Sequence, residues 1–192
     1  MKALEDKILK EGSVLPGHIL KVGSFLNQQL DVAFLMEMGQ EIARLYEGSG
    51  ITKVLTVEAS GIAIAVAAGA AIGVPAVFAK KHQTANVSGK TFSATVHSYT
   101  HNTDYNIVVA ADYLSPDDRV LIVDDFLANG KALCGLFDIV EQAGATAVGA
   151  AVAIEKGFQQ GGDSLRAAGR RVESLAIVDS MTEDSLTFRP QD

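Results

Sequence analysis

Residues 120–132 read Val-Leu-Ile-Val-Asp-Asp-Phe-Leu-Ala-Asn-Gly-Lys-Ala, or VLIVDDFLANGKA. The four apolar residues at 120–123 predict a buried strand, because short runs of this kind fill the interior of parallel sheets. Asp124 and Asp125 follow at the carboxyl end of that strand. A compact loop over residues 126–131 then leads into a helix predicted from 130 to 142. This order of strand, acid pair, loop and helix decides both the fold class and the candidate site.

The loop after the acid pair has the features of an anion site. Backbone N–H groups that open a helix are unpaired and carry about half a positive elementary charge. Gly130 lets the backbone approach an oxygen closely, and the amide of Asn129 is a further donor. Because Asp124 and Asp125 would repel a phosphate, we expect them to bind what lies beside it: sugar hydroxyls, Mg²⁺ or a carbon becoming positive. The alternative is an ordinary strand–turn–helix corner with a solvated aspartate pair.

Strand and helix signals alternate along the rest of the chain. Apolar runs predict strands at 18–22, 53–57, 76–79, 92–98, 107–110, 120–123, 147–154 and 172–177. Amphipathic or small-residue stretches predict helices at 2–11, 31–46, 62–72, 130–142 and 163–168. Such alternation is typical of an α/β fold with a central, mostly parallel sheet flanked by helices, in which we expect 107–110 and 120–123 to be central strands. The sequence contains no evident linker, so we expect a single domain over residues 1–192.

Composition limits the classes of protein that fit. The formal net charge of −7 provides no basic field for nucleic acid, so local donors would have to attract an anionic ligand. The start of the chain, MKALEDKILKEG, lacks the apolar segment of a signal peptide, and the small-apolar run 61–72 is too short to span a bilayer. We therefore expect a cytoplasmic protein with no nucleic-acid partner and no membrane association. Cys134 is expected to be buried, and the four histidines show no metal-ligand spacing.

Three further loops at predicted strand ends carry polar residues. Residues 58–61, Glu-Ala-Ser-Gly, join a strand to a helix and predict a second anion site. Lys80 and Lys81 end the next strand, where they could neutralise a phosphate group. Lys156 follows the strand at 147–154, where its ammonium group could donate to a ligand oxygen. A plain glycine turn and solvated lysines are the alternatives.

The 120–132 stretch resembles the motif by which type I phosphoribosyltransferases bind 5-phosphoribosyl-1-pyrophosphate (PRPP). That motif usually has Thr or Ser and often a second Gly late in the loop, where this chain has Asn129 and Lys131. The DDFLANG segment is similar to that of bacterial xanthine phosphoribosyltransferases. The similarity extends over nearly the full length, including ILKVGSFLNQQLD, VEASGIA, FAKKH and IEKGFQ.

The resemblance implies the type I phosphoribosyltransferase fold, with about residues 1–30 and the carboxyl-terminal part forming a small hood over the base. It implies transfer of the phosphoribosyl group from PRPP to N9 of xanthine, with Mg²⁺ held mainly through PRPP and Asp124 and Asp125 as catalytic residues. The PRPP-binding residues that it implies are Glu58, Ala59, Ser60, Lys81, Ala128, Asn129, Gly130, Lys131 and Ala132. The xanthine-binding residues that it implies are Leu20, Asn27, Phe126 and Lys156.

The resemblance also implies a homodimer and a mobile segment over residues 83–105 that closes over PRPP, with Ser98 and Tyr99 as contacts. A lysine at position 156 suits the 6-oxygen shared by xanthine, guanine and hypoxanthine, and it disfavours adenine and orotate. The preference for xanthine itself rests on the resemblance. A hypoxanthine/guanine phosphoribosyltransferase stays an alternative, as does a non-catalytic PRPP-sensing purine regulator, although such regulators add a basic DNA-binding module that this sequence does not show.

Overall fold

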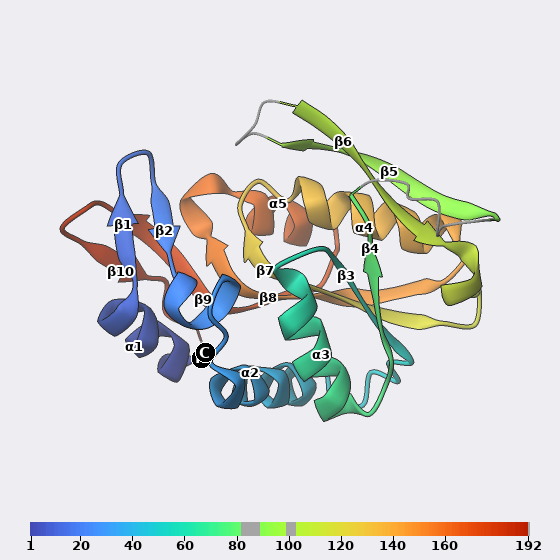
Figure 1. The fold of residues 1–192 in the computed structure, drawn as a ribbon, viewed down its shortest axis with the longest axis horizontal. Coiled ribbons are helices and arrows are strands. Elements are labelled where there is room, and N and C mark those ends of the chain that lie inside the picture. The colour runs from blue at the N-terminus through green and yellow to red at the C-terminus, as the bar shows by residue number, and fades with distance from the viewer. Residues whose placement is uncertain (82–88, 99–102, 192) are drawn as a thin grey trace.

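The computed structural model describes residues 1–81, 89–98 and 103–191. Its centre is a six-stranded sheet in the order β10-β9-β8-β7-β3-β4 (Figure 1). These strands are β3 (Lys53–Val57), β4 (Ala76–Ala79), β7 (Arg119–Leu127), β8 (Thr146–Lys156), β9 (Val172–Met181) and β10 (Leu186–Phe188). Every neighbouring pair is parallel except β9 with β10. The predicted α/β class with a mostly parallel central sheet is therefore confirmed.

Helices cover both faces of this sheet (Figure 1). They are α1 (Lys2–Glu11), α2 (Val32–Leu45) and α3 (Gly61–Ile72) on one side, and α4 (Lys131–Gln142) and α5 (Gly161–Ala167) on the other. Each face has its own cluster of buried apolar side chains. Helix α2 begins where the sequence predicts, because the Asp31 carboxylate accepts the Phe34 N–H at 3.2 Å.

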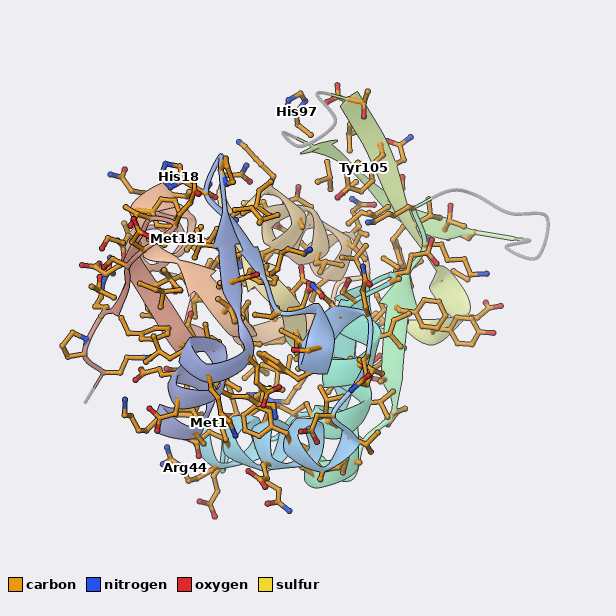
Figure 2. All side chains as sticks on the ribbon, turned by 60° about the vertical axis from the view of Figure 1, so that its left-hand side comes forward. Met1, His18, Arg44, His97, Tyr105 and Met181 are labelled. Carbon is orange, nitrogen blue, oxygen red and sulfur yellow. The ribbon has the colours of Figure 1, made fainter. Side chains whose placement is uncertain are left out.

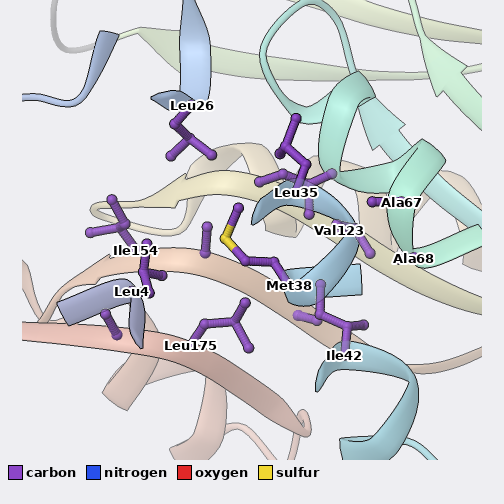
Figure 3. Close-up of a cluster of buried hydrophobic side chains, with 14 of the residues drawn as sticks. Leu4, Leu26, Leu35, Met38, Ile42, Ala67, Ala68, Val123, Ile154 and Leu175 are labelled. Atoms are coloured by element: carbon purple, nitrogen blue, oxygen red, sulfur yellow. The ribbon is translucent and has the colours of Figure 1, made fainter. Parts of the chain in front are cut away.

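The larger core lies between the sheet and the first three helices (Figure 3). Met38 and Ile42 of α2 are fully buried there, beside Val123 of β7. Helices α2 and α3 approach closely because Gly39 has no side chain: a Cβ at this position would lie 2.4 Å from the Ala67 carbonyl oxygen. This packing fixes the strand whose carboxyl end carries the acid pair.

A separate two-stranded sheet lies over α4 (Figure 1). It consists of β5 (Thr91–Ser98) and β6 (Thr103–Ala110), which pair in antiparallel fashion. The prediction of a central strand at 107–110 is therefore wrong, because these residues belong to β6. The apolar run has a different cause: Ile107 packs on α4, where a Cβ on Gly135 would lie 3.1 Å from the Ile107 Cδ1.

The amino-terminal segment has more regular structure than predicted. In place of one strand near 18–22, it forms a hairpin of β1 (Ser13–Leu15) and β2 (Ile19–Lys21), followed by a π-helical turn, η1 (Gly23–Asn27). Each strand has only three residues, too few for alternation to identify it in the sequence. Two short 3₁₀ turns, η2 (Ala111–Tyr113) and η3 (Gly157–Gln159), complete the elements.

Two other predictions need correction. Strand β9 continues to Met181 and is followed by β10, so the chain does not end its regular structure near residue 177. Cys134 is exposed rather than buried, because α4 directs Leu133, Leu136 and Phe137 inward. Among the described residues, no helix combines the length and the apolar character needed to cross a bilayer.

Candidate active site

The acid pair lies inside β7, not after it, because the strand continues to Leu127. Asp124 is buried at 6% exposure, whereas Asp125 is half-buried. The Asp125 N–H donates to the Asp124 Oδ1 at 2.9 Å. Burial, followed by the negative charge of Asp125, raises the pKa of Asp124 well above its ordinary value. The strand thus presents two unequal carboxyl groups at the carboxyl edge of the sheet.

The predicted phosphate loop is shorter than expected and spans residues 128–130 between β7 and α4. Gly130 has a φ of +82°, a conformation that favours glycine, and it immediately precedes α4. The Asn129 Oδ1 accepts the Lys131 N–H at 3.1 Å, so the amide N–H groups of Asn129 stay available as donors. Gly161, the first residue of α5, stabilises the loop, because its N–H donates to the Ala128 carbonyl oxygen at 3.2 Å.

The second predicted anion loop follows β3 and leads into α3. The Glu58–Ala59 peptide bond is cis. The Glu58 carboxylate accepts the backbone N–H of Lys81 at 2.7 Å, so the structure brings together the two segments predicted to bind pyrophosphate. The Lys81 ammonium lies 5.5 Å from the centre of the Tyr105 ring. Its positive charge also favours the ionised form of Asp124 and thereby opposes the rise in the pKa of that residue.

Lys156 ends β8 on the other side of the phosphate loop. Its Nζ donates to the His18 carbonyl oxygen at 3.0 Å and lies 5.8 Å from the centre of the Phe126 ring. Burial lowers the pKa of Lys156. These contacts hold the ammonium group between the β1–β2 hairpin and the end of β7.

One cleft of about 670 Å³ joins the phosphate loop to Lys156. Its lining comes from the hairpin, the β5–β6 sheet, the phosphate loop and the β8 end: Gly17, His18, Ile19, Val96, His97, Tyr105, Ala128, Asn129, Lys131, Ala132, Lys156 and Gln159. Figure 2 shows His18 near the hairpin and, to its right, His97 and Tyr105 on the β5–β6 sheet. The cleft therefore brings the loop predicted to bind phosphate and a half-buried lysine into one space.

Two residues expected near the base are placed differently. Leu20 is buried at 6% exposure in the core, so its side chain is engaged in packing, although its neighbour Ile19 lines the cleft. Asn27 is exposed and lines a separate hollow of about 320 Å³ together with Ala59 and Ser60 of the second anion loop. The structure thus places Asn27 beside the predicted pyrophosphate site.

Sequence reasoning missed several residues of the cleft. The sequence does not single out His18, Tyr105 or Gln159, although Tyr105 ends the segment 83–105 and Gln159 ends the IEKGFQ stretch. His97 pairs with Asp104 across the β5–β6 sheet at 2.6 Å. Tyr99, expected with Ser98 to contact PRPP, lies outside the described residues, as do His82, His101 and the Ser98 side chain. Within the described ranges, no three acidic, histidine or cysteine side chains form a group that could hold a metal.

The match to known families agrees with this geometry. The family model of the phosphoribosyl transferase domain matches residues 24–168. The chain belongs to the phosphoribosyltransferase family, whose enzymes transfer a pentosyl group.

More specific relatives are found within that family. The chain is 50% identical over 187 residues to the xanthine phosphoribosyltransferase of Lachnoclostridium phytofermentans, covering 97% of this chain and 96% of that protein. It is 52% identical over 192 residues to the xanthine phosphoribosyltransferase of Bifidobacterium longum, covering 98% of this chain and all of the relative.

Solved structures agree on the fold. The adenine phosphoribosyltransferase of Giardia lamblia, complexed with 9-deazaadenine, has a TM-score of 0.75 at 22% identity, covering 93% of this chain and 98% of that one. The adenine phosphoribosyltransferase of Rhodothermus marinus has a TM-score of 0.74 at 21% identity, covering 93% of this chain and all of the other. At these identities the likeness establishes the type I phosphoribosyltransferase fold alone.

Proposed function

We propose that this protein is a xanthine phosphoribosyltransferase of purine salvage, which joins xanthine to the phosphoribosyl group of PRPP and releases pyrophosphate. One observation carries the proposal: a single cleft contains the β7–α4 phosphate loop at one side and the Lys156 ammonium at the other. The acid pair stands on the strand directly before that loop. A nucleotide with its phosphate at the loop and its base at Lys156 would have its ribose near the end of β7, the strand that carries the acid pair.

The two ends of PRPP would bind at two loops. Backbone N–H groups of residues 128–132, with the Asn129 amide, would hold the 5-phosphate at the start of α4. The loop at 58–60 and Lys81 would hold the pyrophosphate, because Glu58 already ties these two segments together. Lys81 would also neutralise the negative charge that builds up on pyrophosphate as it leaves.

Asp124 and Asp125 would act on the ribose between these loops. As the bond from C1 to pyrophosphate breaks, the sugar becomes oxocarbenium-like, comparable to the transition state of glycoside hydrolysis. Carboxylates that hold the ribose hydroxyls would stabilise this positive charge. The purine N9 then forms the new bond to C1, pyrophosphate leaves with the electrons of the broken C1–O bond, and the N9 proton is released to solvent. The reaction needs no covalent intermediate with the protein.

Mg²⁺ fits this site as a partner of PRPP. It commonly binds substrate phosphates and retains several waters rather than occupying an all-protein cage. Bound in this way, Mg²⁺ would neutralise charge on the pyrophosphate. We assign no side chain as its direct ligand.

The base would lie against Phe126 with its 6-oxygen facing Lys156. A partly desolvated ammonium forms a strong charge-assisted hydrogen bond to a carbonyl oxygen. Leu20 and Asn27 would complete the base site from the amino-terminal hood, Leu20 through its main chain and Asn27 after a movement from its present place beside Ala59. To select xanthine over guanine, the site would need hydrogen-bond donors at the 2-position, where xanthine carries an oxygen and guanine an amino group. With guanine bound, those buried donors would be left unpaired.

A substrate panel tests the proposal. The purified protein is incubated with PRPP and Mg²⁺ and with xanthine, hypoxanthine, guanine or adenine in separate reactions, and nucleotide formation is measured. We expect the highest kcat/KM with xanthine and none with adenine. A preference for guanine or hypoxanthine would assign the alternative base specificity, and no product from any 6-oxopurine would refute the proposal.

We further infer a cytoplasmic homodimer formed from one domain over residues 1–192. Exposed apolar side chains support self-association: Phe78 and Tyr113 border a groove of about 340 Å³ beside the edge strand β4. Light scattering at micromolar concentration should give twice the 20.2 kDa mass of the chain. The mass of a single chain would contradict the inference.

A further inference from the structure

Thr56 of β3 carries a buried hydroxyl group without a visible purpose in the fold. The residue is 1% exposed, and its Oγ1 has no hydrogen-bond partner among the residues that the structure describes. Buried polar side chains are nearly always paired, so an unpaired one in a native protein asks for an explanation. A hydroxyl that served only stability would be expected to have a partner.

The surroundings of this hydroxyl point to Asp124. A Cβ on Gly61 would lie 2.1 Å from the Thr56 Oγ1 and 2.9 Å from the Asp124 Oδ1. The two oxygens therefore lie within about 5 Å of each other beside Gly61, where any larger side chain would collide with both. Gly61 is also the first residue of α3, directly after the loop proposed for pyrophosphate.

Asp124 has room for another donor. Its Oδ1 accepts one hydrogen bond, from the Asp125 N–H, and a carboxylate oxygen can accept two. The charged or titratable groups that act on it are Asp125 on its own strand, Lys81 at the end of β4 and Tyr105 on β6. Thr56 adds a neutral donor from β3, the strand that pairs with β7.

We propose that Thr56 is a positioning residue for phosphoribosyl transfer: its hydroxyl turns to donate to the Asp124 Oδ1 when the site is filled, and so orients that carboxylate toward the ribose. This inference rests on the function proposed above. A filled site would bring the two oxygens within hydrogen-bond distance, and a bond to an ionised carboxylate is stronger than one between neutral groups. This hydrogen bond is absent in the free protein, forms when the site is filled, and strengthens as positive charge develops on the sugar.

The test compares Thr56→Val, which removes the hydroxyl but keeps the shape, with Thr56→Ser, which retains it. We expect kcat of Thr56→Val to fall about 10- to 100-fold, the range for one hydrogen bond to a charged group, with KM for PRPP little changed. The acid limb of the kcat–pH profile should move to higher pH, because losing a donor to the carboxylate raises the pKa of Asp124. Thr56→Ser should restore both kcat and the profile.

The melting temperature distinguishes a positioning role of Thr56 in the reaction from a purely structural role. Because the lost hydroxyl is unpaired in the free protein, Thr56→Val should leave the melting temperature unchanged or raise it. Thr52→Val is the matched control, since the Thr52 hydroxyl donates to the Asp118 Oδ1 at 3.0 Å and accepts the Arg119 N–H at 2.9 Å. It should lower the melting temperature by about 2–4 °C and leave kcat unchanged.

The two ways of failing are distinguishable. A wild-type protein that forms no nucleotide from PRPP and any 6-oxopurine would overturn the proposed function and this inference with it. An active wild type with wild-type kcat and pH profile in Thr56→Val would overturn the inference alone. A fall in melting temperature without a change in kcat would assign Thr56 to the fold and also overturn the inference.

Discussion

At the scale of the residue, Lys156 shows how the site gains a cation in a protein of net charge −7. The His18 carbonyl oxygen and the Phe126 ring face its ammonium group, and burial lowers its pKa. Part of its solvation is already lost before a ligand arrives. A partly desolvated ammonium group gains more binding free energy from a hydrogen bond to a ligand oxygen than a fully hydrated lysine would.

Replacing Lys156 should therefore weaken base binding selectively. We expect Lys156→Met to raise KM for xanthine about 10- to 100-fold, with KM for PRPP changed less than about threefold. Steady-state kinetics with each substrate varied in turn would measure both values. Lys21→Met, an exposed lysine on β2, is the control and should behave as wild type. An equal rise in both KM values would contradict the proposal that Lys156 binds the base.

Prediction at this scale depends on whether a residue belongs to a local pattern. The sequence marks Asp124, Asp125 and Gly130 as candidates because strand, acids and loop are contiguous. His18 and Tyr105 reach the same cleft from segments far away in the chain, and no local signal marks them. The unpaired state of Thr56 is a property of packing that the sequence does not contain.

At the scale of the element, the β5–β6 sheet depends on one small residue of α4. A Cβ on Gly135 would lie 2.9 Å from the Val96 Cγ2 and 3.1 Å from the Ile107 Cδ1. Val96 lines the cleft, so the approach of this sheet to α4 sets one wall of the site. The same contact explains why the apolar run at 107–110 is not a central strand.

A larger side chain at position 135 should displace that wall. We expect Gly135→Val to lower kcat/KM for PRPP at least about 10-fold, because misplacing a wall of a catalytic site is costly to the reaction. Cys134→Val, the same replacement at the exposed neighbouring position, should keep wild-type kinetics. Full activity in Gly135→Val would show that the position of the sheet does not matter for catalysis.

A partly buried ion pair joins β8 and α5 next to Lys156, and it includes the Ser174 hydroxyl of β9. The Glu155 carboxylate is fully buried and accepts from Arg166 at 2.6 and 3.0 Å and from the Ser174 hydroxyl at 2.5 Å. Gly162 makes room for it, since a Cβ there would lie 2.1 Å from the Glu155 Oε1. Glu155 directly precedes Lys156, so this network fixes the strand end that carries the cation.

Breaking the pair should destabilise the protein. Arg166→Met would leave a buried carboxylate unpaired, and we expect a loss of about 3 kcal/mol in the free energy of unfolding. The Arg166 side chain is 31% exposed, which keeps the value at the low end for buried pairs. Urea unfolding would measure it. Arg44→Met, which removes a surface pair with Glu41, should leave the unfolding midpoint nearly unchanged, and equal effects of the two variants would contradict the account.

At the scale of the whole molecule, the sequence predicted the layered α/β architecture and most of the central strands. Its errors lie where tertiary contacts override local pattern, as in the three-residue strands of the β1–β2 hairpin and the continuation of β7 through the acid pair. The predicted phosphate loop, the second anion loop and Lys156 all lie at the carboxyl edge of the sheet, as the parallel arrangement requires. The sequence did not predict that the hairpin and the β5–β6 sheet form walls of the cleft; only the structure shows this.

The net charge of −7 also has a consequence at this scale. Long-range attraction of a polyanionic substrate is weak, so we expect binding to rely on the two predicted anion loops and the lysines near them. The proposed reaction therefore requires that a sugar phosphate binds in the loop at 128–130 with its sugar beside Asp124 and Asp125.

A crystal structure of the complex with xanthosine monophosphate tests that placement most directly. We predict that the phosphate accepts hydrogen bonds from the backbone N–H groups of residues 128–132, that the ribose hydroxyls contact the acid pair, and that the purine 6-oxygen lies within about 3.2 Å of the Lys156 Nζ. A nucleotide bound elsewhere, with this loop empty, would contradict the account.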